Sequence, residues 1–106
     1  MTLNNKTIAN GINKSLRTYK QIEKMYAGDG TRATAMKLFR EVYPRYAWYN
    51  TNVALITMMK NGYITGLNIE NGSIVEPINP VLTQKAFDDI KEKEESLKRM
   101  GTDNAV

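Results

Sequence analysis

The sequence contains no histidine and no cysteine among its 106 residues. Without these residue types the chain cannot build an ordinary nucleophile–base pair or a transition-metal site of the usual ligands. Disulfides and thiolate chemistry are excluded by the same absence. Asp88 and Asp89 are adjacent carboxylates, but neighbours on a helix point in different directions. We therefore expect a protein that is not an enzyme and that uses no cofactor or metal.

Long hydrophobic runs are also missing. No stretch approaches the roughly 18 apolar residues of a membrane span, and the first residues, MTLNNKTIANG, lack the apolar segment of a secretory signal. Apolar residues make up 42% of the chain and charged residues 25%, as in ordinary globular proteins. We expect one domain over residues 1–101, a flexible tail over residues 102–106, and a cytoplasmic location in a bacterium or its host.

The charges are distributed unevenly along the chain. Residues 1–62 contain ten Lys and Arg against three Asp and Glu, a net charge of +7, whereas residues 63–106 carry a net charge of −3. A half this positive favours a polyanionic partner, because binding releases condensed counterions. The alternative is a basic face that is only solvated.

Two helices are predicted in the first half. Apolar residues recur every three or four positions over residues 6–27, although Gly11 should delay a firm start to about Asn13. The outer face of this helix is basic, with Lys14, Arg17, Lys20 and Lys24, and is either solvated or in contact with phosphate. Gly28-Asp29-Gly30 predicts a turn, since the Gly-Lys-Ser/Thr ending of a phosphate loop is absent. Thr31 should cap a second helix that ends before Pro44.

The second half predicts a helix, a hairpin and a last helix. A helical pattern over residues 45–61 ends at Gly62. Strands over residues 63–69 and 73–78 should pair around a type I′ turn at Asn71-Gly72, which places Ile69 opposite Ile74. Thr83 should cap the last helix, and Gly101 should end it. The side chains expected in the core are Ile8, Ile12, Leu16, Tyr19, Leu38, Phe39, Leu55, Met58, Ile64, Phe87 and Ile90.

One stretch resembles a known family. Leu55 and Met58, followed by Gly62 and the apolar pair Tyr63-Ile64, are similar to the signature of the winged helix-turn-helix domain. Leu82-Thr83 resembles the Leu-Thr step that follows the wing. The likeness is nearest to small winged-helix proteins of phages and mobile elements, and it covers about the last sixty residues. It implies a mainly α fold with a small β-hairpin, in the order α-α-α-β-β-α.

The resemblance implies a sequence-specific double-stranded DNA-binding protein that regulates transcription in a phage or mobile element. Its third helix would enter the major groove, where all four base pairs are distinguishable. Arginine pairs with guanine and asparagine with adenine there, so the expected base-reading residues are Arg45, Tyr49, Asn50 and Asn52. The expected contacts with the DNA backbone are Arg32, Lys37, Arg40, Thr57 and Lys60.

Winged helices also bind proteins, and the wing tip favours that alternative. It carries Glu70 and no basic residue, so it would repel phosphate. The alternative function is a protein-interaction module, such as a phage-encoded inhibitor or a packaging or assembly factor that binds a host or phage protein. Its anchor would be Tyr46, Trp48 and Tyr49, unless Tyr46 and Trp48 fill the gap between the second and third helices. Leu97 and Met100 on the last helix suggest a homodimer contact.

Overall fold

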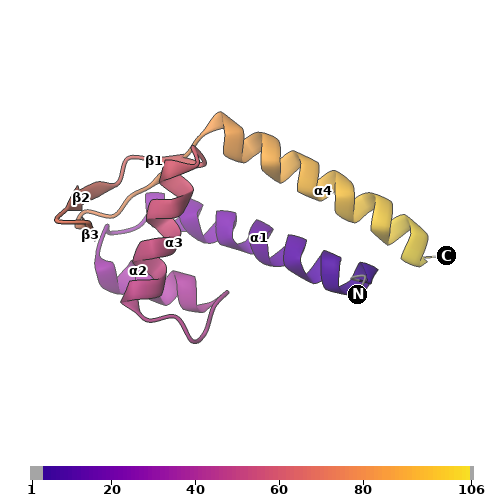
Figure 1. Cartoon of the computed structure of the whole chain (residues 1–106), viewed down its shortest axis with the longest axis horizontal. Coiled ribbons are helices and arrows are strands. Elements are labelled where there is room, and N and C mark those ends of the chain that lie inside the picture. The colour runs from indigo at the N-terminus through magenta and orange to yellow at the C-terminus, as the bar shows by residue number, and fades with distance from the viewer. Residues whose placement is uncertain (1–3, 106) are drawn as a thin grey trace.

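The computed structural model describes residues 4–105 as a mainly helical domain with a small antiparallel hairpin. Its elements are α1 (Asn5–Tyr26), α2 (Arg32–Arg40), α3 (Trp48–Lys60), β1 (Ile64–Thr65), β2 (Asn68–Glu70), β3 (Ser73–Val75), β4 (Val81–Leu82) and α4 (Gln84–Ala105). The long helices α1 and α4 run antiparallel side by side, while α2, α3 and the hairpin gather at the opposite end from the termini (Figure 1). The four expected helices are confirmed. In place of the two expected strands, the structure has four short strands.

The first two helices begin at side-chain caps. Asn4 Oδ1 accepts a hydrogen bond from the Thr7 N–H at 2.8 Å, which satisfies a donor that the first turn leaves free. α1 is therefore helical from Asn5, and the expected start near Asn13 is wrong. Thr31 Oγ1 accepts from the Thr34 N–H at 3.2 Å, so the expected cap of α2 is confirmed.

The last helix is capped as expected but is longer. Thr83 Oγ1 accepts from the Ala86 N–H at 3.4 Å. α4 then continues through Gly101 to Ala105, so the expected end at Gly101 is wrong. A glycine costs a helix only about 1 kcal/mol when its backbone stays helical.

The tip of the hairpin agrees with the expectation. Asn71 and Gly72 have φ values of 51° and 78°, the left-handed angles of a type I′ turn. Ile69 lies opposite Ile74 in the register, which confirms the cross-strand pair.

The base of the hairpin differs, because the ladder is interrupted. β1 pairs with β4 through Ile64 and Leu82, and residues 76–80 loop out between β3 and β4. Within this loop Ile78 is buried in the core, and its N–H donates to the Gly30 carbonyl at 2.7 Å. Asn79 Nδ2 donates to the Met25 carbonyl at 2.9 Å. The expected strand over residues 73–78 is therefore wrong beyond Val75, since the chain bonds to the α1–α2 turn instead of to the ladder.

The core lies where α1, α2, α3 and the strands meet. Tyr19, Phe39, Leu55 and Ile64 are buried as expected. The remaining expected members are less covered: Ile12, Leu16, Leu38, Met58 and Ile90 are half-buried. Ile8 and Phe87 are 39% and 48% exposed, so their expected burial is wrong. Ile8 lies in the half of α1 that only α4 accompanies (Figure 1), and Phe87 faces a surface groove beside Tyr26.

A hydrogen-bonded carboxylate links α1 to α4. Tyr19 Oη donates to Asp89 Oδ2 at 2.6 Å, and Lys93 Nζ donates to Asp89 Oδ1 at 2.7 Å. Burial alone would raise the pKa of Asp89, but the hydrogen bonds from Lys93 and Tyr19 outweigh it and lower that pKa. Burial, followed by the bond to Asp89, raises the pKa of Tyr19.

This link predicts a pH dependence of stability. The pKa of Asp89 is lower in the folded than in the unfolded chain, so its ionised form contributes stability above the unfolded pKa of about 4. That contribution is lost as the pH falls through the folded-state pKa. The free energy of unfolding is measured by denaturant titration as the pH is lowered from about 6 to below the folded-state pKa of Asp89. Over this pH range Asp89→Asn should lose less stability than the wild type. Asp88→Asn, an exposed neighbour, is the control and should follow the wild type. Equal losses for Asp89→Asn and the wild type would contradict the prediction.

Candidate nucleic-acid interface

One face of α3 is exposed on the surface of the domain. Leu55 and Thr51 lie on its buried side. On the opposite side Tyr49 is 74% exposed and Val53 43%, and Thr57 and Lys60 follow along the helix. These four residues recur every three or four positions, so they share one face; we call them the α3 face. Val53 is the member that the sequence analysis missed, although its spacing of four from Tyr49 would have identified it.

Two expected base-reading asparagines at the start of α3 are held by the backbone. Asn50 is exposed, and its Oδ1 accepts from the Ala47 N–H at 2.9 Å, which caps the helix. Asn52 is half-buried, and its Oδ1 accepts from the Ile74 N–H at 2.8 Å. The expectation that Asn52 faces outward is wrong, because this side chain fastens α3 to β3.

The aromatic residues before α3 pack mainly inward. The rings of Tyr43 and Tyr46 stack with centroids 4.4 Å apart, and burial raises the pKa of Tyr46 with a smaller effect of Tyr43. The Arg32 guanidinium lies 4.4 Å above the Trp48 ring. Tyr46 and Trp48 are half-buried against the core, so they fill the gap between α2 and α3. Tyr49 remains as an exposed aromatic side chain at this end of α3.

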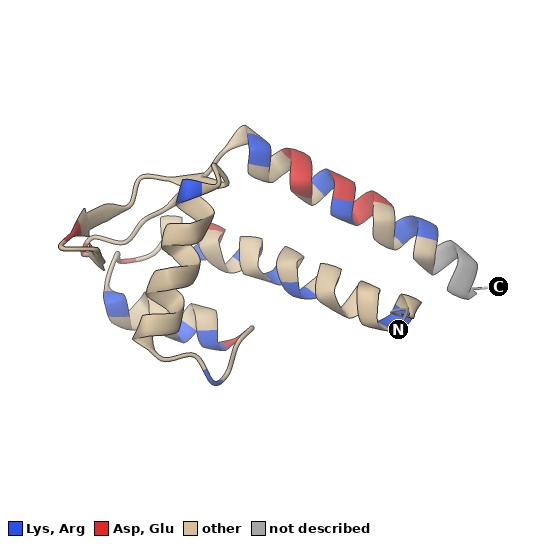
Figure 2. Cartoon of the chain, viewed as in Figure 1, with Lys and Arg blue, Asp and Glu red and all other residues tan. Residues whose placement is uncertain are grey.

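The cations expected to contact DNA lie on α2, on α3 and on the loop before α3. Within residues 4–105, no acidic side chain forms an ion pair with any of these exposed residues: Arg32, Lys37, Arg40, Arg45 and Lys60. Arg40 Nε donates to the Tyr46 carbonyl at 2.8 Å, which fixes the guanidinium, and its terminal nitrogens have no hydrogen-bond partner among the residues that the structure describes. Figure 2 shows basic segments on α2 and on the loop before α3.

The hairpin side is acidic. Glu76 Oε2 accepts from the Arg32 N–H at 2.7 Å, in the first turn of α2. A helix N-terminus attracts anions, and here a carboxylate of the chain occupies that position. Glu70 is exposed at the end of β2, next to the turn at Asn71-Gly72, and Figure 2 shows an acidic segment at the hairpin tip. The contact of Glu76 could not be read from the sequence, because its partner lies 44 residues away.

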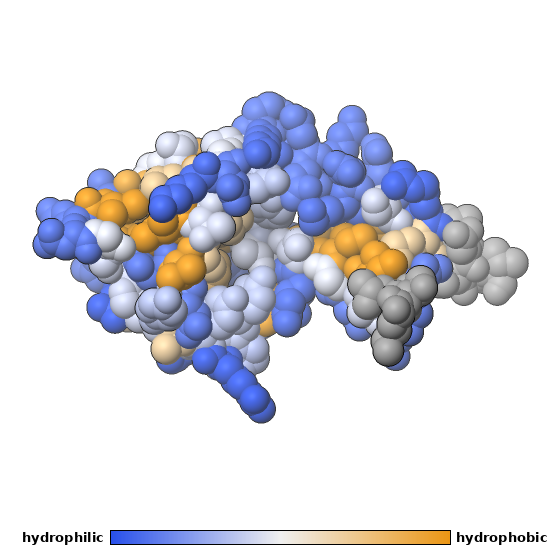
Figure 3. All heavy atoms as spheres, viewed as in Figure 1, coloured by the Kyte–Doolittle hydropathy of each residue, from blue (hydrophilic) through white to orange (hydrophobic). Residues whose placement is uncertain are grey.

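Apolar surface also remains on this end of the molecule. Hydrophobic atoms gather where α3 meets the hairpin (Figure 3), and the exposed aliphatic residues of these elements are Val53 and Ile69. A second group lies between the outer halves of α1 and α4 (Figure 3). Leu97 and Met100 are half-buried on α4, and a homodimer contact through them stays a prediction.

Comparisons of the chain with protein-family models, with curated proteins and with solved structures find no match. None of the helices within residues 4–105 has the length and apolar character needed to cross a membrane.

Proposed function

We propose that this chain is a winged-helix protein that binds double-stranded DNA, with the α3 face directed into the major groove and the hairpin as the wing. The observation that carries the proposal is the α3 face itself: an exposed helix surface, accompanied on α2, on α3 and on the loop before α3 by cations that form no ion pair with an acid within residues 4–105. A helix fits the major groove, and uncompensated Lys and Arg supply the sequence-independent part of DNA affinity.

The proposal gives the side chains separate roles. Arg45, Tyr49 and Asn50 stand at the N-terminal end of α3, which is the end that contacts base edges in helix-turn-helix proteins. The DNA phosphates would be bound by a second group of side chains: Arg32, Lys37, Arg40, Thr57 and Lys60. These contacts would set the register of the protein on the duplex without reading its sequence. Sequence-specific occupancy of a promoter would then regulate transcription.

The roles are tested by comparing a selected duplex with a random one. Tyr49 and Lys37 are exposed, and within the described residues neither side chain forms a hydrogen bond, an ion pair or a ring contact, so their substitution should leave the fold intact. Tyr49→Ala should cost roughly 1–3 kcal/mol of binding free energy on a duplex selected from a random library, and little on random DNA. Lys37→Ala should weaken both and lower the salt slope by about one.

Lys91→Ala, exposed on α4, is the control and should bind both duplexes like the wild type. An equal loss on both duplexes for Tyr49→Ala would remove sequence readout from the proposal. A wild type that binds neither duplex at about 50 mM salt would overturn DNA binding altogether.

A second candidate function is a protein-interaction module, favoured by the exposed Tyr49 and Val53 together with the acidic hairpin side. Tyrosine is enriched among the residues that dominate protein interfaces, and Glu70 and Glu76 would disfavour phosphate on that side. This candidate predicts weak, unselective DNA binding by the wild type in the same titrations.

A further inference from the structure

A row of cations follows one edge of α1. Lys14, Arg17, Lys20 and Lys24 are all exposed, at spacings of three, three and four residues, and we call them the α1 ridge. Their ten-residue span corresponds to about 15 Å of helix. None of them forms an ion pair with an acid in the described part of the chain, although like charges three or four residues apart repel.

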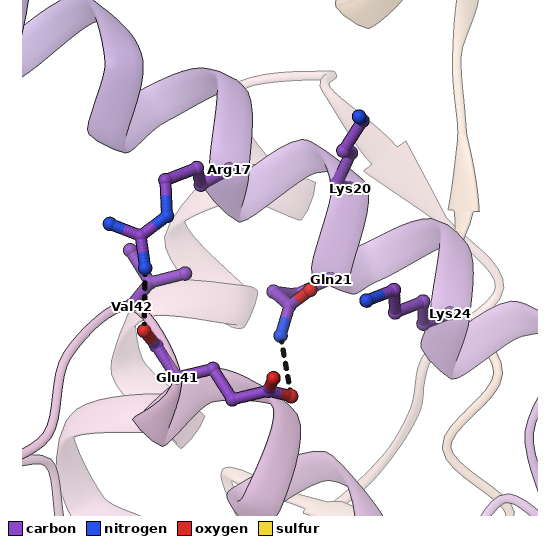
Figure 4. Close-up of a pocket in the computed structure, with 6 residues that line it drawn as sticks. All are labelled: Arg17, Lys20, Gln21, Lys24, Glu41 and Val42. Carbon is purple, nitrogen blue, oxygen red and sulfur yellow. Dashed lines mark hydrogen bonds between the residues drawn. The ribbon is translucent and has the colours of Figure 1, made fainter.

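The ridge borders a hollow of about 240 Å³ between α1 and the end of α2 (Figure 4). Arg17 Nη2 donates to the Glu41 carbonyl at 2.7 Å, which holds the guanidinium in place and leaves other donors of its fork free. Gln21 Nε2 donates to Glu41 Oε2 at 3.0 Å. Lys24 points toward these two residues, whereas Lys20 extends away from them (Figure 4). Glu41 is thus a single carboxylate among three cations.

The ridge is continuous with the loop that precedes α3. The Lys14 ammonium lies 5.2 Å from the centroid of the Tyr43 ring. Lys14 and Arg45 also line one surface hollow, together with Tyr43, Pro44 and Tyr46. The basic segments of α1, of α2 and of this loop lie along the lower side of the view in Figure 2.

A ridge of this length and sign matches a phosphodiester backbone. Phosphates of one DNA strand rise about 3.4 Å each along the duplex axis while the strand winds around it, so a straight ridge of about 15 Å faces part of a run of roughly four phosphates. We propose that the α1 ridge, with Arg45, binds the phosphate backbone of the duplex segment beside the one that the α3 face contacts. This inference rests on the DNA binding proposed above. It assigns phosphate contact to the basic outer face of α1, which the sequence left as either solvated or in contact with phosphate, and it gives that contact a position on the duplex.

The proposal predicts effects of opposite sign for two substitutions in the hollow. Lys20→Gln/Lys24→Gln removes two charges whose side chains form no hydrogen bond or ion pair in residues 4–105. On a random duplex of about three helical turns, its slope of log affinity against log salt should be smaller by about 1.8, at about 0.9 per lost phosphate contact. Glu41→Gln keeps an oxygen that can accept the hydrogen bond from Gln21, but it removes the repulsion between the Glu41 carboxylate and the DNA phosphates. The Glu41→Gln variant should therefore bind the same duplex more tightly than the wild type.

Lys91→Gln is the matched control, because it removes an exposed charge on α4 outside the ridge and should leave the slope unchanged. A duplex trimmed to the segment selected through the α3 face should abolish the difference between wild type and Lys20→Gln/Lys24→Gln. If the double variant had the wild-type salt slope on the long duplex, the α1 ridge would not bind phosphates, although the proposed DNA binding by the α3 face would be unaffected. If the slope of the double variant stayed smaller on the trimmed duplex as well, the α1 ridge would not lie against the neighbouring segment of the duplex. Absence of any wild-type binding at about 50 mM salt would remove the proposed function and the ridge together.

Discussion

Leu55→Ala is expected to lower the free energy of unfolding by about 2–5 kcal/mol, because it leaves a cavity that the surrounding residues fill only partly. Leu55 is 0% exposed, at the centre of a cluster to which α1, α2 and the strands all contribute. The helix itself should tolerate alanine, since alanine has the highest helix propensity. The loss should therefore come from packing, and denaturant unfolding followed by circular dichroism would measure it.

Val53→Ala provides the matched control on the same helix. Val53 is 43% exposed on the α3 face, and a surface substitution of this kind usually changes stability by less than about 0.5 kcal/mol. A Leu55→Ala protein as stable as Val53→Ala would show that α3 does not bury this side chain. The assignment of Tyr49, Val53, Thr57 and Lys60 to the outward face would then fail as well, because the two faces are opposite sides of one helix.

Local signals explain what the sequence predicted correctly. The caps at Thr31 and Thr83 and the turn at Asn71-Gly72 depend on residues within a few positions of one another, so their chemistry is visible in the sequence. The same holds for the outward position of Tyr49, which follows from the burial of Leu55 through helix periodicity.

The errors arise where distant partners decide the outcome. Asn52 is turned from the surface by a backbone donor 22 residues away in β3. Ile78 leaves the expected strand because its N–H bonds to Gly30 in the α1–α2 turn. Ile8 has the right spacing for the core, but periodicity gives only the direction of a side chain and not whether another element covers it. The position of Glu76 at the start of α2 was likewise not predictable, because its partner Arg32 lies 44 residues away.

Gly30→Ala is expected to be the other strongly destabilising change, with a loss of about 2–5 kcal/mol. Gly30 has a φ of +78°, which costs an L-residue about 1–2 kcal/mol. An added Cβ would also lie 2.8 Å from Asn79 Oδ1 and 3.0 Å from Pro77 Cβ, and such overpacking typically costs about 1–3 kcal/mol. If Asn79 moved to avoid the added Cβ, its hydrogen bond to the Met25 carbonyl would break, and this bond ties the hairpin to the end of α1.

Two other glycines separate the conformational from the steric part of this cost. Gly72 has the same φ of +78° but nothing within 4 Å of an added Cβ, so Gly72→Ala should lose only the conformational part, about 1–2 kcal/mol. Gly11 lies inside α1 with nothing within 4 Å, so Gly11→Ala should stabilise the protein by about 0.5–1 kcal/mol. Denaturant unfolding of the three variants should therefore rank them Gly11→Ala, Gly72→Ala, Gly30→Ala, from most to least stable. If Gly30→Ala were no less stable than Gly72→Ala, residues 76–80 would have to yield to the added methyl group. That result would mean that this loop does not fix the hairpin to the α1–α2 turn.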